Sequence, residues 1–168
     1  KPAYHRDVSE IDDEPIWLDD EERRAWFALV SVVMRLPQAL DAQVRRDAQL
    51  THFEFSVLTV LSNSPEHKMK MSTLAATVEG SLSRLSQVVT RLEKRNWVRR
   101  VPDDHDGRTT HTQLTTEGLA MVEAAAPGHV ALVRKLVIDP LTREQLTQLA
   151  DIGERIMAAI DPSHHLPG

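Results

Sequence analysis

The sequence contains no cysteine and no apolar run long enough to cross a bilayer. The missing cysteines exclude disulfide bonds, thiolate metal sites and thiol-based redox sensing. A membrane-spanning helix needs about 20 apolar residues, and no stretch approaches that length. The chain also does not open with the basic and then apolar segment that is typical of a secretory signal. We therefore expect a cytoplasmic protein with no membrane partner.

Signatures of catalysis and of metal binding are also missing. There is no glycine-rich phosphate loop and no nucleophile elbow, and carboxylate pairs such as Asp12-Asp13 lie in polar stretches suited to a solvated surface. None of the eight histidines has the i, i+4 spacing of a helical zinc motif. The sequence predicts no cofactor, no metal and no enzyme, with a generic hydrolase as a distant alternative.

The net charge of −5 is unevenly distributed along the chain. Residues 80–108 carry seven Lys or Arg against four acids, whereas the remainder carries 13 against 21. Such a separation can give one basic face on an acidic body, as DNA-binding proteins often have. Any run of this length varies by a few charges at random, so the charge alone does not establish a DNA-binding face. The motifs have to distinguish the two interpretations.

Apolar residues recur at spacings of three and four over most of the chain, which predicts helices. The first helix begins near Asp19, and we expect Pro37 to bend or break it because proline lacks a backbone donor. Thr51 with Glu54, and Thr142 with Gln145, fit capping boxes that open two further helices. The remaining expected helices cover residues 72–78, residues 83–95 with Ser83 as the cap, and residues 116–137.

After residue 95 the apolar pattern changes to alternation. Residues 97–101 and 109–114 predict two strands of a hairpin, joined by a turn that contains Asp106-Gly107. A lone hairpin is marginally stable, so it must lean on the neighbouring helices. Two helices followed by a hairpin form a winged helix-turn-helix. The expected fold class is mainly α with a small β-hairpin.

The helix over residues 83–95 has the composition of a DNA recognition helix. Leu85, Val88, Val89 and Leu92 form one apolar stripe. The opposite face holds residue types that read DNA, namely Arg84, Ser86, Gln87, Thr90, Arg91 and Lys94. Arg84 and Gln87 are the candidates for reading bases, because the start of a recognition helix contacts base edges. The others, Ser83, Ser86, Thr90 and Arg91, suit bases or phosphates.

Two simpler interpretations remain open for these segments. An ordinary solvated amphipathic helix would have a similar charge pattern, but the position of this helix after a short helix and a tight turn favours DNA binding. At the hairpin tip, Arg108 could enter a minor groove, where A·T-rich tracts concentrate negative potential, with Asp106 as its partner across the turn. Asp-Gly is also simply good turn chemistry, and a solvated Arg108 fits that interpretation.

The combined motif resembles the MarR family of transcriptional regulators. Residues 101–118 are similar to the family's wing signature, an Asp-x-Arg at the tip, a strand, and Leu-Thr-x-x-Gly opening a helix. Residues 71–75 and 83–97 are similar to its helix-turn-helix, which closes on Arg-Leu-Glu-Lys-Arg. The resemblance covers roughly residues 19–160. The sequence departs from the family pattern at two places. Asn96 stands where the family usually has glycine, and Glu79-Gly80 is unusual in the turn before the recognition helix.

The resemblance implies a homodimer that binds a near-palindromic stretch of double-stranded DNA. It assigns the major-groove face to the recognition-helix candidates above, and gives Asp106 the role of bracing Arg108. The polar, proline-containing ends of the sequence predict an N-terminal arm over residues 1–18 and a tail over 161–168, and the resemblance implies a single domain over 19–160. Within that domain, residues 19–47 and 116–160 would form a helical dimerisation region, and residues 51–115 the winged helix-turn-helix DNA-binding lobe.

Members of the family often respond to small aromatic or phenolic effectors, and the resemblance implies a cleft for one. Trp26, Arg46, His52 and Phe53 are plausible lining residues, since a carboxylate needs Arg or His and a ring needs an aromatic wall. The simpler interpretation places Trp26 and Phe53 in the core and Arg46 and His52 on the surface. We expect a DNA-binding regulator, most often a repressor in this family. The alternative is a helical protein-interaction module that uses a winged helix for protein contacts.

Overall fold

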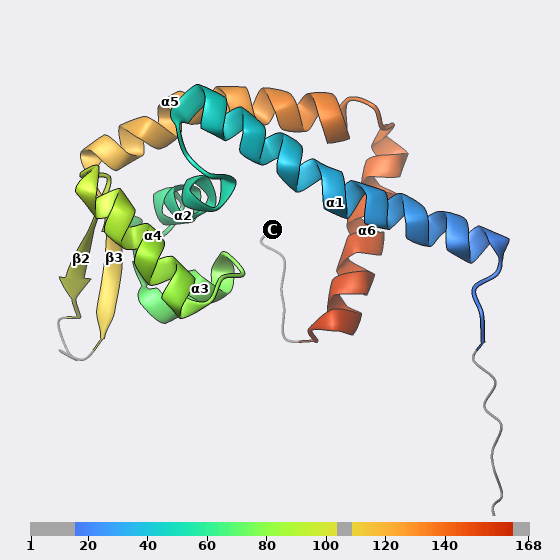
Figure 1. The fold of residues 1–168 in the computed structure, drawn as a ribbon, viewed down its shortest axis with the longest axis horizontal. Coiled ribbons are helices and arrows are strands. Elements are labelled where there is room, and N and C mark those ends of the chain that lie inside the picture. Colours follow the sequence, from blue (N-terminus) through green and yellow to red (C-terminus); the bar gives the residue numbers. More distant parts are fainter. Residues whose placement is uncertain (1–15, 104–108, 163–168) are drawn as a thin grey trace, which may run out of the picture. The chain divides into compact units, whose positions relative to one another are not determined.

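The computed structural model describes residues 16–103 and 109–162 (Figure 1). The chain forms two compact units, the first ending at Leu36 and the second beginning at Pro37. Helix α1 (Asp20–Ala48) spans the boundary. Asp19 opens it, because its carboxylate accepts hydrogen bonds from the backbone N–H groups of Glu21 and Glu22.

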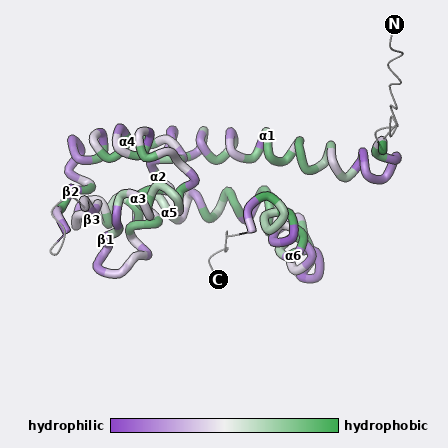
Figure 2. The backbone as a smooth tube through the Cα atoms, turned by 90° about the horizontal axis from the view of Figure 1, so that it is seen from below, coloured by the Kyte–Doolittle hydropathy of each residue, from purple (hydrophilic) through white to green (hydrophobic). Residues whose placement is uncertain are grey.

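The break expected at Pro37 does not occur. Helix α1 continues through Pro37 for three further turns, because proline removes a single backbone donor while the flanking turns keep theirs. Before Pro37 the helix exposes several large apolar side chains, among them Trp26, Phe27, Val33 and Met34. Helix α6 (Arg143–Ile160) exposes a second set, namely Leu149, Ile152, Ile156 and Ile160. Hydrophobic segments recur along both helices in Figure 2.

The core of the second unit lies among α2 (His52–Ser62), α3 (Met71–Thr77), α4 (Leu82–Lys94) and α5 (Thr116–Val133). Helix α2 packs against α3, α5 and the sheet. The fully buried side chains of this core come from α2, α3 and α4, from the end of α1 and from Leu50, and include Val44, Leu58, Leu61, Leu74, Leu85 and Leu92. The predicted capping box at Thr51 and Glu54 is confirmed, with both of its hydrogen bonds present.

The sheet has three antiparallel strands in the order β1-β3-β2. The predicted hairpin accounts for two of them, and the third was not predicted. Strands β2 (Val98–Pro102) and β3 (Thr110–Leu114) form the wing, with Val98 opposite Leu114. Strand β1 (Lys68–Lys70) pairs with the far side of β3. The sequence did not predict β1 because three residues are too few to establish an alternating pattern. The helix-helix-hairpin order confirms the winged helix-turn-helix.

The C-terminal helices follow the sequence closely. Thr115 caps α5 and Thr142 opens α6 with the predicted capping box. Helix α5 stays regular through Pro127, and the predicted end near Val137 lies in a π-helical turn over Arg134–Ile138. Among the described residues, no helix combines the length and apolar character needed to span a membrane.

Candidate nucleic-acid interface

Helix α4 presents the predicted polar face. Its apolar stripe of Leu85, Val88, Val89 and Leu92 is buried, which fixes the opposite face outward. The cap is Ser81, whose hydroxyl accepts from the backbone N–H of Arg84 at 3.2 Å, so the prediction of Ser83 as the cap is wrong. The cap lies two residues before the predicted one, and the helix begins at Leu82, which is exposed and therefore not part of the apolar stripe.

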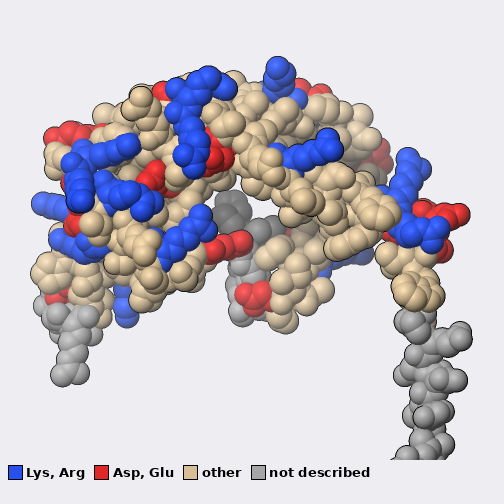
Figure 3. Space-filling view, viewed as in Figure 1, with Lys and Arg blue, Asp and Glu red and all other residues tan. Residues whose placement is uncertain are grey.

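The described candidates occupy one continuous helix face. Ser83, Arg84, Gln87, Thr90 and Arg91 are exposed, and Ser86 is half-buried. Lys and Arg side chains gather over the lobe that contains α4 in Figure 3. Asp106 and Arg108, the two candidates at the wing tip, lie outside the described residues.

Arg100 on β2 braces the recognition helix against the wing. Its guanidinium donates to the backbone carbonyl of Ser86 at 2.9 Å and to the hydroxyl of Thr90 at 3.1 Å, and it forms an ion pair with Glu93. The Thr90 hydroxyl in turn donates to the same Ser86 carbonyl. Ser86 and Thr90 therefore already have polar partners within the protein.

Arg91 is also engaged, by the first turn of α2. Its Nε donates to the carboxylate of Glu54 at 2.9 Å, and that carboxylate also accepts from the backbone N–H and hydroxyl of Thr51. Burial raises the pKa of Glu54, but these hydrogen bonds outweigh it and hold the pKa below its ordinary value. The contact between Arg91 and Glu54 joins the recognition helix to α2.

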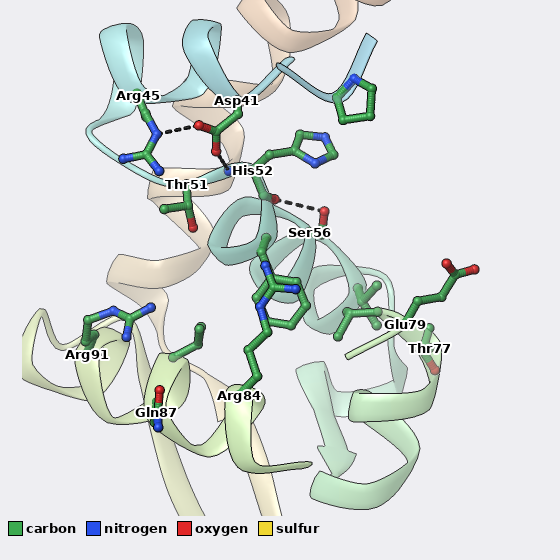
Figure 4. Close-up of a pocket in the computed structure, with 15 residues that line it drawn as sticks. Asp41, Arg45, Thr51, His52, Ser56, Thr77, Glu79, Arg84, Gln87 and Arg91 are labelled. Atoms are coloured by element: carbon green, nitrogen blue, oxygen red, sulfur yellow. Dashed lines mark hydrogen bonds and ion pairs between the residues drawn. The ribbon is translucent and has the colours of Figure 1, made fainter. Parts of the chain in front are cut away.

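A cavity of about 670 Å³ lies between α2, the end of α3, α4 and residues 37–48 of α1 (Figure 4). Its size is within the usual range for small-molecule sites. Two of the four predicted ligand residues, His52 and Phe53, line it. Arg46 lies at a different hollow, beside Asp47, and Trp26 belongs to the first unit, where its side chain is half-exposed.

His52 has two separate roles at the edge of this cavity. Its backbone N–H donates to Asp41 at 2.8 Å, and this bond is the largest cause that lowers the pKa of Asp41, ahead of the contact with Arg45. Its ring lies 5.6 Å from the ring of His129 on α5, measured between centroids. Burial lowers the pKa of both imidazoles.

Sequence reasoning did not identify Arg100, Leu82 or the second role of Glu54. Arg100 reads as one of several cations in the wing, and its partners on α4 are set by the packing of the strand against the helix. Glu54 was recognised only as a capping residue. Its partner Arg91 is 37 residues away, so no local pattern reports the pair.

Comparisons with known proteins show which family has this sequence and fold. The MarR family model matches residues 50–110. The chain is 39% identical to Sco3205 of Streptomyces coelicolor, a MarR family transcriptional regulator solved in complex with DNA, with a TM-score of 0.85 over 90% of this chain and 95% of that one. The chain belongs to the MarR family.

The chain is also similar to two further transcriptional regulators. AbsC of Streptomyces coelicolor is 36% identical, with a TM-score of 0.83 over 88% of this chain and 99% of AbsC. The transcriptional regulator PecS of Dickeya dadantii is 29% identical over 140 residues, which is 83% of each chain. These relatives are transcriptional regulators, and the chain belongs among them.

Proposed function

We propose that this MarR protein is a transcriptional regulator that binds a near-palindromic DNA operator as a homodimer. The observation that carries the proposal is helix α4, which has a buried apolar stripe and an exposed face of Ser83, Arg84, Gln87 and Thr90. An α-helix fits the major groove, and Arg and Gln are suited to guanine and adenine. The complex of its relative Sco3205 with DNA supports this proposal.

The exposed apolar side chains support the dimer. Residues 26–34 of α1 and 149–160 of α6 each expose a series of large apolar side chains, and exposed apolar patches often mark protein–protein contacts. A second copy of the chain is the partner that we propose, in line with the helical dimerisation region that the family resemblance implies. A two-fold dimer would present two recognition helices about 34 Å apart, matched to two half-sites.

We propose repression as the mode of regulation, because relatives such as MprA of Escherichia coli are repressors. We also propose that the protein acts in the cytoplasm and has no catalytic activity. The cavity beside α4 is the proposed site for a small aromatic effector that releases the DNA. His52 and Phe53 line it, and it combines aromatic, aliphatic and cationic side chains. The protein-interaction alternative has no comparable support.

Selection of duplexes from a random pool by the purified protein tests the proposal. We expect enrichment of an inverted repeat whose half-site centres are about one helical turn apart. The proposal fails if selection enriches no sequence, or enriches an asymmetric site that a monomer occupies.

A further inference from the structure

Arg100 on β2 contacts the recognition helix at three residues that lie along a single line. Its guanidinium donates to the backbone carbonyl of Ser86 at 2.9 Å and to the hydroxyl of Thr90 at 3.1 Å, and it forms an ion pair with Glu93. Residues spaced by four and three positions lie one above the other on the same flank of a helix. One side chain of the wing therefore spans about two turns of α4.

The backbone of Arg100 strengthens the same junction. Strand β2 lies at the edge of the described sheet, and the backbone N–H of Arg100 donates to Glu93 at 2.9 Å. The side chains of Arg100 and Glu93 are only 30% and 29% exposed. The carboxylate of Glu93 therefore covers part of the strand edge and neutralises the guanidinium. The charge of Arg100 is already paired inside the protein before any DNA phosphate approaches.

This junction restricts how α4 can turn about its own axis. The buried stripe from Leu85 to Leu92 holds one side of the helix, and the contacts with Arg100 hold a second side. Side chains reach about 5–6 Å from the axis of a helix, so a turn of about 10° moves their ends by roughly 1 Å. A hydrogen bond to a base edge weakens steeply over such a displacement. The rotation of α4 therefore governs how well Arg84 and Gln87 reach the bases.

We propose that Arg100 is a positioning residue for DNA reading, which fixes the rotation of α4 so that its exposed face meets the base edges. The inference rests on the proposed function, since it concerns the operator contacts of α4. Arg100 itself contacts neither base nor phosphate, and it acts through the residues of the recognition helix. The role needs a guanidinium, because its planar fork donates to Glu93 and to the oxygens of Ser86 and Thr90 together, whereas lysine offers a single point charge.

The experiment measures binding of the full chain to the selected operator, to its single-base-pair variants and to random duplex, by fluorescence anisotropy over a salt series. Arg84→Ala and Gln87→Ala first identify the base pairs that α4 reads. Arg100→Lys then keeps the charge without the fork, and Arg100→Gln removes both. Arg99→Lys is the matched control, because Arg99 is the neighbouring arginine on β2 and donates to Gln113 at 2.8 Å within the wing. Circular dichroism and stoichiometric titration give the folded and active fractions of every variant.

We expect both Arg100 variants to lose discrimination roughly 3- to 10-fold at all base pairs that α4 reads, since each base contact is weakened by about one hydrogen bond. Affinity for random duplex and its salt dependence should match those of the wild type, because Glu93 already neutralises Arg100. Arg99→Lys should keep the discrimination of the wild type.

Four other results would each overturn the proposal. Loss of discrimination at one base pair alone would make Arg100 a base reader. A salt slope lower by about one in Arg100→Gln would make it a phosphate contact. Reduced stability with full discrimination in the folded fraction would leave it a purely structural role. An equal loss in Arg99→Lys would assign the effect to the wing in general.

Glu93→Gln tests the junction from the side of the helix, and it replaces the Arg100 variants if these do not fold. The amide offers one acceptor oxygen and no charge, so it no longer holds both the backbone N–H and the guanidinium of Arg100. Discrimination should again fall at all base pairs that α4 reads, and full discrimination in this variant would contradict the proposal. A wild type without preference for any duplex refutes the proposed function itself, whereas a selective wild type with equally selective variants refutes only the role of Arg100.

Discussion

The carboxylate of Glu54 in α2 accepts a hydrogen bond from Nε of Arg91 in α4, across a distance of 2.9 Å. Glu54 is almost fully buried, whereas the side chain of Arg91 is half-exposed. The same carboxylate closes the capping box of Thr51. One buried acid therefore fixes both the start of α2 and the docking of the recognition helix.

Replacing this acid should destabilise the fold. We expect Glu54→Gln to lower the free energy of unfolding by roughly 1–3 kcal/mol, because it weakens charge-assisted hydrogen bonds to Arg91 and Thr51. Urea denaturation followed by circular dichroism measures the change. Arg91→Gln should cost less, since its side chain is half in water. If the two single losses simply add in the double variant, the two residues are not coupled.

Stability should fall as the pH is lowered from neutral. Burial depresses the pKa of His52 and of His129, so the unfolded chain takes up protons more readily than the folded one. The stability that depends on the neutral imidazoles is complete above the ordinary histidine pKa of about 6.5, and is lost as the pH falls toward the depressed folded pKa values. Asp41 faces His52 and opposes the shift only in part.

Thermal unfolding between pH 7.5 and 5.0 tests this dependence. A His129→Gln variant should show a shallower decline than the wild type, because one half-buried titrating group is gone. An unchanged slope in this variant would contradict a role for His129. Below that range, protonation of Glu54 and Asp41, whose pKa values are also depressed in the fold, should reduce stability further.

Two glycines should respond to alanine in opposite directions. At Gly118 a Cβ would lie 2.0 Å from the backbone oxygen of Trp97, so Gly118→Ala must separate α5 from the start of the wing. We expect a loss of stability of more than about 2 kcal/mol. At Gly153 on α6 nothing lies within 4 Å, and Gly153→Ala should be neutral or stabilise by roughly 0.5–1 kcal/mol. The denaturant midpoints of both variants, compared with that of the wild type, measure these changes in stability.

A charge on the apolar face of α6 should weaken the proposed dimer. Ile152 is 54% exposed in the single chain, and we expect Ile152→Asp to raise the dimer dissociation constant at least tenfold, since both copies lose a buried apolar side chain. Sedimentation equilibrium measures the constant. Ala158→Asp adds the same charge on the opposite face of the helix, so it should leave the dimer intact. Equal dissociation in the two variants would argue against this face as the interface.

Local signals in the sequence predicted most of the fold. The capping pairs at Thr51 and Thr142 lie within a single turn, and the apolar stripe from Leu85 to Leu92 is periodic, so each could be read without tertiary information. Asn96, just after the recognition helix, has a left-handed backbone with a φ of 58°, a conformation that asparagine tolerates at helix ends. Strand β1 could not be read, because it depends on pairing with a strand more than 40 residues away.

The site was predictable in composition but not in contacts. The exposed face of α4 follows from its apolar stripe, so the candidates on it could be named in advance. The partners of these residues could not, because Arg91 meets Glu54, Arg84 meets Phe53 and Ser86 meets Arg100 only through packing. The roles of the candidates in DNA binding stay predictions.

The most direct test of DNA binding through α4 is fluorescence anisotropy with DNA from upstream of the protein's own gene, over a salt series and against random duplex. The wild type should bind the upstream DNA in preference to random duplex, and its affinity should fall steeply as salt rises, because neutralised phosphates release counterions. Arg84→Ala should weaken specific binding by about 1–3 kcal/mol and narrow that preference. Equal affinity for upstream and random duplex, or a preference that survives Arg84→Ala unchanged, would contradict recognition of the operator through this helix.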